Sequence, residues 1–113
     1  MSQAFETRVR VQDGVAVVDL HGEINAAAET ALNAGYQQAE QAGGAAVLLN
    51  FEDVPYINST GIALIVGVLA QARKAQRRLV VYGLSEHYQE IFRITRLSDF
   101  MQIYSDERSA LAG

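Results

Sequence analysis

The sequence predicts an α/β fold in one domain over residues 1–113: a mixed, largely parallel β-sheet with an N-terminal hairpin and helices packed beside it. The observations that predict it are an alternating strand pattern at the start, continuous apolar runs further on, and helical spacing between those runs. A chain of 113 residues buries a core without covalent staples. Cysteine is absent, which excludes disulfide and cysteine-based metal frameworks.

The N-terminal segment has the pattern of a β-hairpin. Residues 5–12 alternate apolar and polar side chains, which is typical of a strand with one solvated face. Asp13 and Gly14 form a tight-turn dipeptide, and residues 15–20 supply the second strand. Asn25 then follows as the expected N-cap of the next helix.

The middle of the chain alternates helix and strand signals. From Ala26 onward, apolar residues recur at helical spacing and predict an amphipathic helix; its inward face holds Ala28, Leu32, Tyr36 and Ala39. Gly35 lies inside this helix at some cost in stability, and we expect it where the helix packs closely against a neighbour. Residues 45–51 form an apolar run broken only by Asn50, which predicts a strand buried on both faces.

A long helix follows the loop that ends at Pro55. Between Ile62 and Ala70 the chain is apolar apart from Gly67, so the pattern alone does not define a polar face. We assign one stripe to the core: Ile62, Ile65, Val66 and Leu69. Leu64 and Val68 fall on a different side, where they would form an apolar docking patch if exposed. A helix buried on both sides is the open alternative.

The C-terminal third predicts two further strands and two helices. Residues 79–82 form a short buried strand that ends at Gly83, and Ser85 caps the helix that follows. Residues 101–104 read as the last strand, and Ser105 is the expected cap of a terminal helix.

The charge pattern narrows the class of partner. A net charge of -4 and a pI near 5.0 argue against direct binding to nucleic acid. Four basic residues still cluster near the end of the long helix: Arg73, Lys74, Arg77 and Arg78. They indicate either a solvated helix end or a surface for an acidic partner. No secretory signal or membrane-length apolar run is visible, so we expect a soluble, cytoplasmic protein with no membrane insertion.

The polar residues Asn58, Ser59 and Thr60 directly precede the apolar helix and form the candidate functional site. Their oxygens can cap the helix start. A serine hydroxyl displayed there is also a candidate phosphorylation site, because free amides and the helix dipole favour an added phosphate. Thr60 is the second choice, since its β-branched side chain lies one position further into the helix.

No residue pattern indicates an enzyme or a bound cofactor. A phosphate-binding glycine loop is absent, and His21 and His87 lack metal-ligand spacing. Ser59 is outside a G-x-S-x-G context, and the carboxylates Glu52 and Asp53 read as solvated loop charges. We therefore expect no catalysis, no cofactor and no metal.

Three blocks carry a family resemblance: residues 18–25 (VDLHGEIN), residues 57–62 (INSTGI), and residues 92–97 (FRITRL) followed by Ile103 and Tyr104. With these the chain resembles the STAS family, the domains shared by sulfate transporters and bacterial anti-sigma factor antagonists. The middle block is the most specific, because the family signature there is an acidic residue, a serine, a serine or threonine, and a glycine that opens a helix.

The resemblance implies a non-enzymatic, phosphorylation-switched regulator. In such antagonists the unphosphorylated domain binds an anti-sigma factor that is also a serine kinase, and phosphorylation at the serine matching Ser59 reverses this; a phosphatase is a further expected partner. The implied partner-binding residues are Asn25, Asn58, Ser59, Thr60, Gly61, Leu64 and Val68. This chain has Asn25 and Asn58 where the family commonly has aspartate, so the capping oxygens are kept and the charge is lost.

Two alternatives to the switch remain open at this stage. One is a constitutive STAS subunit of a larger assembly, such as a stressosome-like scaffold or an accessory subunit of a lipid transporter. The other is a domain that binds a small molecule or nucleotide, or an enzyme of unrecognised type. Phosphorylation by a cognate kinase separates the switch from the constitutive subunit.

Overall fold

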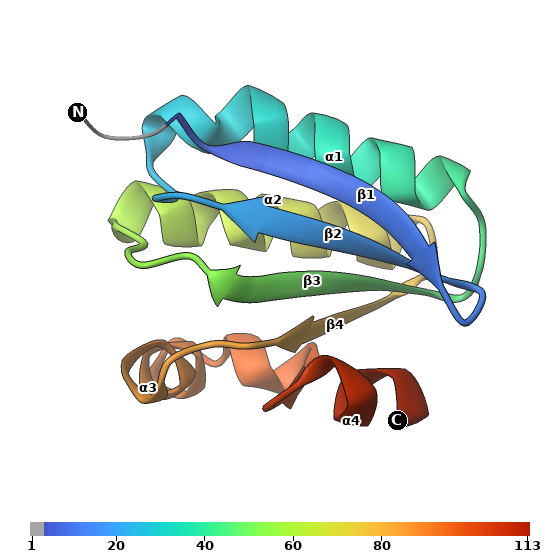
Figure 1. The fold of residues 1–113 in the computed structure, drawn as a ribbon. Coiled ribbons are helices and arrows are strands. Elements are labelled where there is room, and N and C mark those ends of the chain that lie inside the picture. The colour runs from blue at the N-terminus through green and yellow to red at the C-terminus, as the bar shows by residue number, and fades with distance from the viewer. Residues whose placement is uncertain (1–3) are drawn as a thin grey trace.

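A five-stranded sheet with strand order β1-β2-β3-β4-β5 organises the chain, and the computed structural model describes residues 4–113 of it (Figure 1). The strands are β1 (Glu6–Gln12), β2 (Val15–His21), β3 (Ala46–Asp53), β4 (Arg78–Tyr82) and β5 (Gln102–Tyr104). β1 and β2 pair antiparallel, and every later neighbour pairs parallel. The predicted mixed sheet with an N-terminal hairpin is confirmed.

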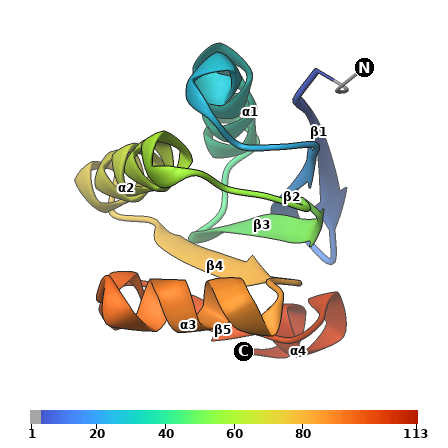
Figure 2. The same cartoon turned by 90° about the vertical axis from the view of Figure 1, so that its left-hand side faces the viewer.

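Helices cover both faces of this sheet. They are α1 (Glu29–Gln41), α2 (Ser59–Lys74), α3 (Glu86–Ile94) and α4 (Glu107–Ala112), with short 3-10 turns η1 (Ala26–Ala28) and η2 (Leu97–Asp99). Figure 2 shows α1 and α2 on the same side of the sheet, with α4 on the other side of β4. Within residues 4–113, no helix combines the length and apolar character needed to cross a bilayer.

Two hydrophobic clusters fill the faces of the sheet. The larger joins β2 and β3 to α1, α2 and α3, and within it the rings of Phe51 and Phe92 meet edge to face at 6.1 Å between centroids. The smaller places Val17, Leu48 and Val80 against Ala110 of α4. Because neighbouring residues of β3 are buried on opposite faces, the prediction of a strand covered on both sides is confirmed.

Short sequence motifs predicted where several helices and strands begin or end. Asp13 and Gly14 have φ of 53° and 78° and connect Gln12 to its ladder partner Val15, as a two-residue hairpin turn requires. Asn25 caps η1 and Ser85 caps α3, as predicted. The cap of α4 is Asp106, not Ser105 as expected: its Oδ1 accepts from the Ser109 amide at 2.8 Å.

Helix α1 lies directly on the hairpin. The predicted inward residues of this segment are all at most 1% exposed: Ala28, Leu32, Tyr36 and Ala39. A Cβ atom on Gly35 would lie 2.7 Å from the Thr7 Oγ1 atom, so the glycine lets the helix backbone approach β1 closely. Close packing is therefore the confirmed reason for this residue.

Helix α2 is rotated relative to the predicted phase. Its buried residues are Gly61, Ile65, Val68, Leu69 and Ala72, which recur at helical spacing. Val66, which was assigned to the core, is 45% exposed, whereas Val68, which was expected on the outer side, is 0% exposed. Both assignments were wrong, because an apolar segment without a polar face does not define its own rotation.

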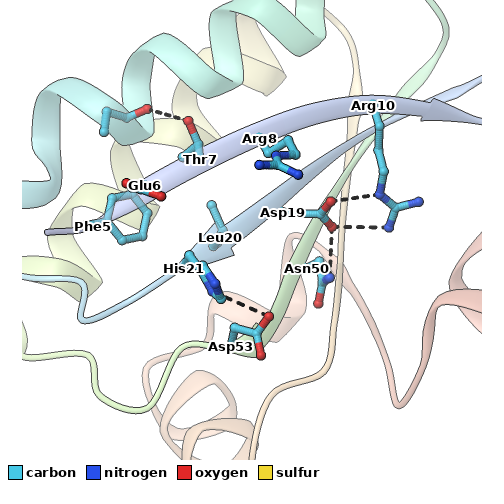
Figure 3. Close-up of a pocket in the computed structure, with 11 residues that line it drawn as sticks. Phe5, Glu6, Thr7, Arg8, Arg10, Asp19, Leu20, His21, Asn50 and Asp53 are labelled. Atoms are coloured by element: carbon cyan, nitrogen blue, oxygen red, sulfur yellow. Dashed lines mark hydrogen bonds and ion pairs between the residues drawn. The ribbon is translucent and has the colours of Figure 1, made fainter. Parts of the chain in front are cut away.

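A polar network ties α4 to the hairpin across the second face of the sheet. The Arg10 guanidinium donates to Asp19 at 2.8 Å and 3.2 Å, to the Tyr82 hydroxyl at 3.3 Å, and to Glu107. Tyr82 in turn donates to Glu107 at 2.7 Å, and Asn50 donates to Asp19 at 2.9 Å. Figure 3 shows the Arg10, Asp19 and Asn50 part of this network.

This network shifts the pKa of several of its members. Hydrogen bonds from Arg10 and then Tyr82 hold the pKa of Glu107 below its usual value. Burial raises the pKa of Asp19, but hydrogen bonds from Arg10 and Asn50 outweigh it and lower that pKa overall. Burial, followed by the hydrogen bond to Glu107, raises the pKa of Tyr82.

Acid is expected to weaken the fold through Glu107. Because its pKa is lower in the folded chain, the carboxylate stabilises the fold fully above its ordinary value of 4.5, and this contribution is lost as the pH falls through the lower folded value. Glu107→Gln should therefore be less stable than wild type at neutral pH and lose less further stability on acidification. Urea unfolding as a function of pH measures both effects.

Glu90→Gln provides the control for this measurement. Glu90 also pairs with an arginine, Arg93, but its side chain is 55% exposed and solvent screens the pair. Glu90→Gln should follow the wild-type acid profile closely. A Glu107→Gln protein that loses as much stability on acidification as wild type would contradict the role assigned to the network.

Candidate functional site

Ser59 is the first residue of α2, and Asn58 caps the helix in front of it. The Asn58 Oδ1 atom accepts from the Gly61 amide at 2.8 Å, and its backbone oxygen accepts from Ile62 at 2.9 Å. The predicted placement of three polar residues at a helix start is therefore confirmed.

Backbone pairing holds two loops together at this helix start. Ile24 and Ile57 form a parallel bridge; the Ile24 amide donates to the Tyr56 oxygen at 2.9 Å, and the Asn58 amide donates to the Ile24 oxygen at 3.2 Å. Asn25, the N-cap of η1, follows Ile24 directly and so lies beside the start of α2. The structure thus brings together the first and second blocks of the family resemblance.

Gly61 permits this close approach. A Cβ atom at this position would lie 2.1 Å from the Ile24 oxygen and 2.9 Å from the Ile57 Cγ2 atom. Contacts that short do not occur with real side chains, so any larger residue would push α2 away from residues 22–25. Gly61 therefore contributes to the site by allowing close packing. Because it is buried, it does not present a surface to a partner.

Helix α3 anchors the loop that precedes α2. The buried Tyr88 hydroxyl accepts from the Ile57 amide at 2.9 Å and lies 3.4 Å from the Ile57 oxygen, to which it can donate. The residue before Asn58 is therefore anchored through both of its backbone polar groups. Tyr88 was not among the predicted site residues, because its link to Ile57 depends on how α3 packs.

Ser59 and Thr60 are exposed, and within residues 4–113 no hydrogen bond engages either hydroxyl. Next to them lie Ala63, which is exposed, and Leu64, which is half-buried against the core. We call these four residues the α2 patch. Ala63 was missed by sequence reasoning, although its position four residues after Ser59 places it on the same face.

Besides the buried Gly61, two more of the predicted partner-binding residues change role. Val68 is fully buried and cannot contact a partner. Leu64 presents only part of its side chain, so the apolar surface beside Ser59 is smaller than the sequence suggested. Both residues were assigned to the outer side of α2 from the sequence pattern alone, and that pattern does not define which side of the helix faces the core.

The electrostatics at Ser59 favour an added anion. The Asn58 side chain already satisfies the Gly61 amide, whereas the amides of Ser59 and Thr60 lie in the first turn, where a helix supplies no internal acceptor. Asn25 and Asn58 are neutral, and α2 has no acidic residue in its first turn. An anion on Ser59 would therefore meet the positive end of the helix without a neighbouring carboxylate in that turn.

A surface hollow away from Ser59 lies along β1 and the ends of β2 and β3 (Figure 3). It measures about 690 Å³ and contains charges of both signs. Arg10 is paired with Asp19, and the His21 Nδ1 atom lies 3.4 Å from the Asp53 Oδ2 atom. Within residues 4–113 no group of three or more His, Cys, Asp or Glu residues has metal-site geometry.

Comparison with known proteins identifies the family to which this chain belongs. The STAS domain model matches residues 6–110, and the chain belongs to the STAS domain family. An anti-sigma-B factor antagonist of Listeria monocytogenes is 29% identical over 107 residues, which cover 95% of this chain and 93% of the relative.

Solved structures of the same fold agree. An anti-sigma factor antagonist from Mycobacterium paratuberculosis superposes with a TM-score of 0.83 at 21% identity and covers 99% of this chain and 97% of its own. The Bacillus cell fate determinant SpoIIAA in its phosphorylated form superposes with a TM-score of 0.67 at 22% identity and covers 94% and 96%. The expectation of a regulator rather than an enzyme agrees with the family and with the Listeria relative, which is named as an antagonist.

Proposed function

We propose that this protein is an anti-sigma factor antagonist that works as a phosphorylation-switched binding module. Its unphosphorylated form binds an anti-sigma factor that is also a serine kinase, and phosphorylation at Ser59 releases that partner. A phosphatase resets the switch. The observation that carries the proposal is the exposed Ser59 hydroxyl, which has no hydrogen bond to any of residues 4–113. It lies at the start of α2, beside the apolar residues of the α2 patch.

The α2 patch explains why a phosphate would release the partner. A partner that covers Ala63 and Leu64 must also cover the neighbouring Ser59 hydroxyl, because the three residues share one end of the helix. A phosphoserine adds nearly two negative charges at that point. Burying such a hydrated group in a contact that includes apolar side chains is costly.

The fold itself is expected to tolerate the phosphate. The free amides of the first turn and the helix dipole stabilise an anion at Ser59, so phosphorylation does not require α2 to move. The related SpoIIAA fold has been solved in a phosphorylated form, which is consistent with this view. Asn25 and Asn58 keep their capping hydrogen bonds without charge, so the partner is held there by polar rather than ionic contacts.

Phosphorylation assays test the proposal directly. The protein is incubated with ATP and each candidate anti-sigma kinase from the source genome, and its intact mass is measured before the modified peptide is mapped. We expect the mass of one phosphoryl group on Ser59, retained in Thr60→Ala and lost in Ser59→Ala. A chain that binds its anti-sigma factor but stays unmodified, or is modified only at another residue, would contradict the switch and favour a constitutive subunit.

A further inference from the structure

An apolar groove lies beyond the α2 patch, between the C-terminal half of α2 and the segment around η2. It measures about 370 Å³ and is lined by Val66, Leu69, Ala70, Arg73, Thr95, Arg96, Leu97 and Phe100. Leu69 and Leu97 are buried, whereas Val66 and Phe100 are 45% and 53% exposed. The groove therefore has an apolar floor with two large side chains open to solvent at its edges.

This groove continues into a basic hollow. The second hollow measures about 500 Å³ and shares Leu69, Arg73 and Phe100 with the groove. It adds two arginines, Arg77 and Arg78, and one carboxylate, Asp99, to the lining. The Arg73 guanidinium lies over the Phe100 ring, 5.2 Å from its centroid, and so marks the junction between the two. We call the combined surface the α2–η2 groove.

The positive charge of this groove is largely unpaired. Within residues 4–113 no ion pair joins Arg73, Arg77 or Arg78 to a carboxylate; only Arg96 has one, with Asp99 at 2.9 Å. Arg78 donates to the neutral Gln102 side chain, and Arg77 donates to the Gly44 oxygen. These cations gather on a chain whose formal net charge is -4.

We propose that the α2–η2 groove is a second docking site and that its occupant is an acidic protein segment with a bulky apolar side chain. The apolar side chain enters between Val66 and Phe100, and neighbouring carboxylates pair with Arg73 and the arginines beyond it. Arginine forms strong, geometrically specific pairs with carboxylates, and buried aromatic and arginine contacts dominate many protein interfaces. Ser59 does not line this site, so the proposal does not depend on the switch.

A concave surface favours a protein segment over a membrane. Phe100 lies against Arg73 and lines the groove together with the buried Leu97, which gives an inserted side chain a pocket to fill. Binding to a bilayer instead requires an apolar face that can be buried in the membrane interface, with cations on the polar side. Anionic vesicles therefore form a separate arm of the test.

Selection from a random displayed peptide library, with the wild-type protein as bait, tests the chemistry of the occupant without assuming a sequence. We expect enrichment of peptides that combine Asp or Glu with a bulky apolar residue. Their affinity should fall at least about tenfold in Arg73→Glu and in Phe100→Ala, and it should fall as salt is raised. Ser59→Asp should bind these peptides as wild type does. The peptide test can therefore fail while the phosphorylation switch holds, or succeed while the switch fails.

Lys74→Glu is the matched control for this test. Lys74 is the next residue of α2 and carries the same charge, but it does not line the α2–η2 groove. The proposal is overturned if no peptide is enriched, if the enriched peptides lack acidic residues, or if Lys74→Glu weakens binding as much as Arg73→Glu. Salt-sensitive binding to phosphatidylglycerol vesicles without acidic peptide enrichment would also overturn it and assign the surface to lipid. Thermal melting of each variant confirms that it folds.

Discussion

Replacing Ser59 with aspartate is expected to leave the fold intact and to weaken binding to the anti-sigma factor at least about tenfold, which corresponds to about 1.4 kcal/mol. The carboxylate would carry its charge into the contact made by the α2 patch, where desolvation is costly. An acidic residue in the first turn of a helix is itself stabilising by roughly 0.3–1 kcal/mol. The thermal midpoint should therefore stay the same or rise while binding, measured by calorimetry, is lost.

Two further variants separate this effect from simpler explanations. Ser59→Ala removes the phosphoacceptor without adding charge and should bind as wild type does. Ser105→Asp adds the same charge at an exposed residue just before α4, on the other side of the sheet from α2, and should also bind normally. Equal affinities for Ser59→Asp and Ser59→Ala would show that the partner does not cover this hydroxyl.

The glycines of α2 are expected to respond to alanine in opposite directions. Gly61→Ala should lower the free energy of unfolding by about 2 kcal/mol, because its Cβ atom would lie 2.1 Å from the Ile24 oxygen and overpacking costs roughly 1–3 kcal/mol. Gly67→Ala should raise it by about 0.8–1 kcal/mol, the ordinary helix preference of alanine over glycine. Urea unfolding of both variants measures the difference.

Gly67 is a suitable reference because it lies in the same helix, is exposed, and would place its Cβ atom in open space. The Gly61 substitution should also weaken partner binding, since it separates Asn58 from the Ile24 oxygen that its amide contacts. Should both alanine variants stabilise the protein by the same amount, the two loops would not be packed as tightly as the structure shows.

Features encoded in short stretches of sequence were predictable. The Asp13-Gly14 turn and the caps Asn25, Asn58 and Ser85 follow from local chemistry, and each was found where expected. At the terminal helix the choice between the adjacent Ser105 and Asp106 was wrong by one residue, because both are good caps.

Features that depend on tertiary packing were not predictable in the same way. The rotation of α2 depends on how the helix packs, including the close approach of Gly61 to Ile24, so Val66 and Val68 were wrongly assigned to core and surface. The ion pair of Arg10 with Glu107 joins residues 97 positions apart. The α2–η2 groove likewise needs two segments that meet only in the folded chain.

Tyr88 bonds both backbone groups of Ile57, and Ile24 bonds the backbone of the neighbouring Tyr56 and Asn58, which has a consequence for timing. We expect a loop anchored in this way to keep its conformation when Ser59 is modified. Under the proposed function, the delay between a cellular signal and the exchange of partners is then determined by how fast the kinase and phosphatase turn over, and not by relaxation of the antagonist itself.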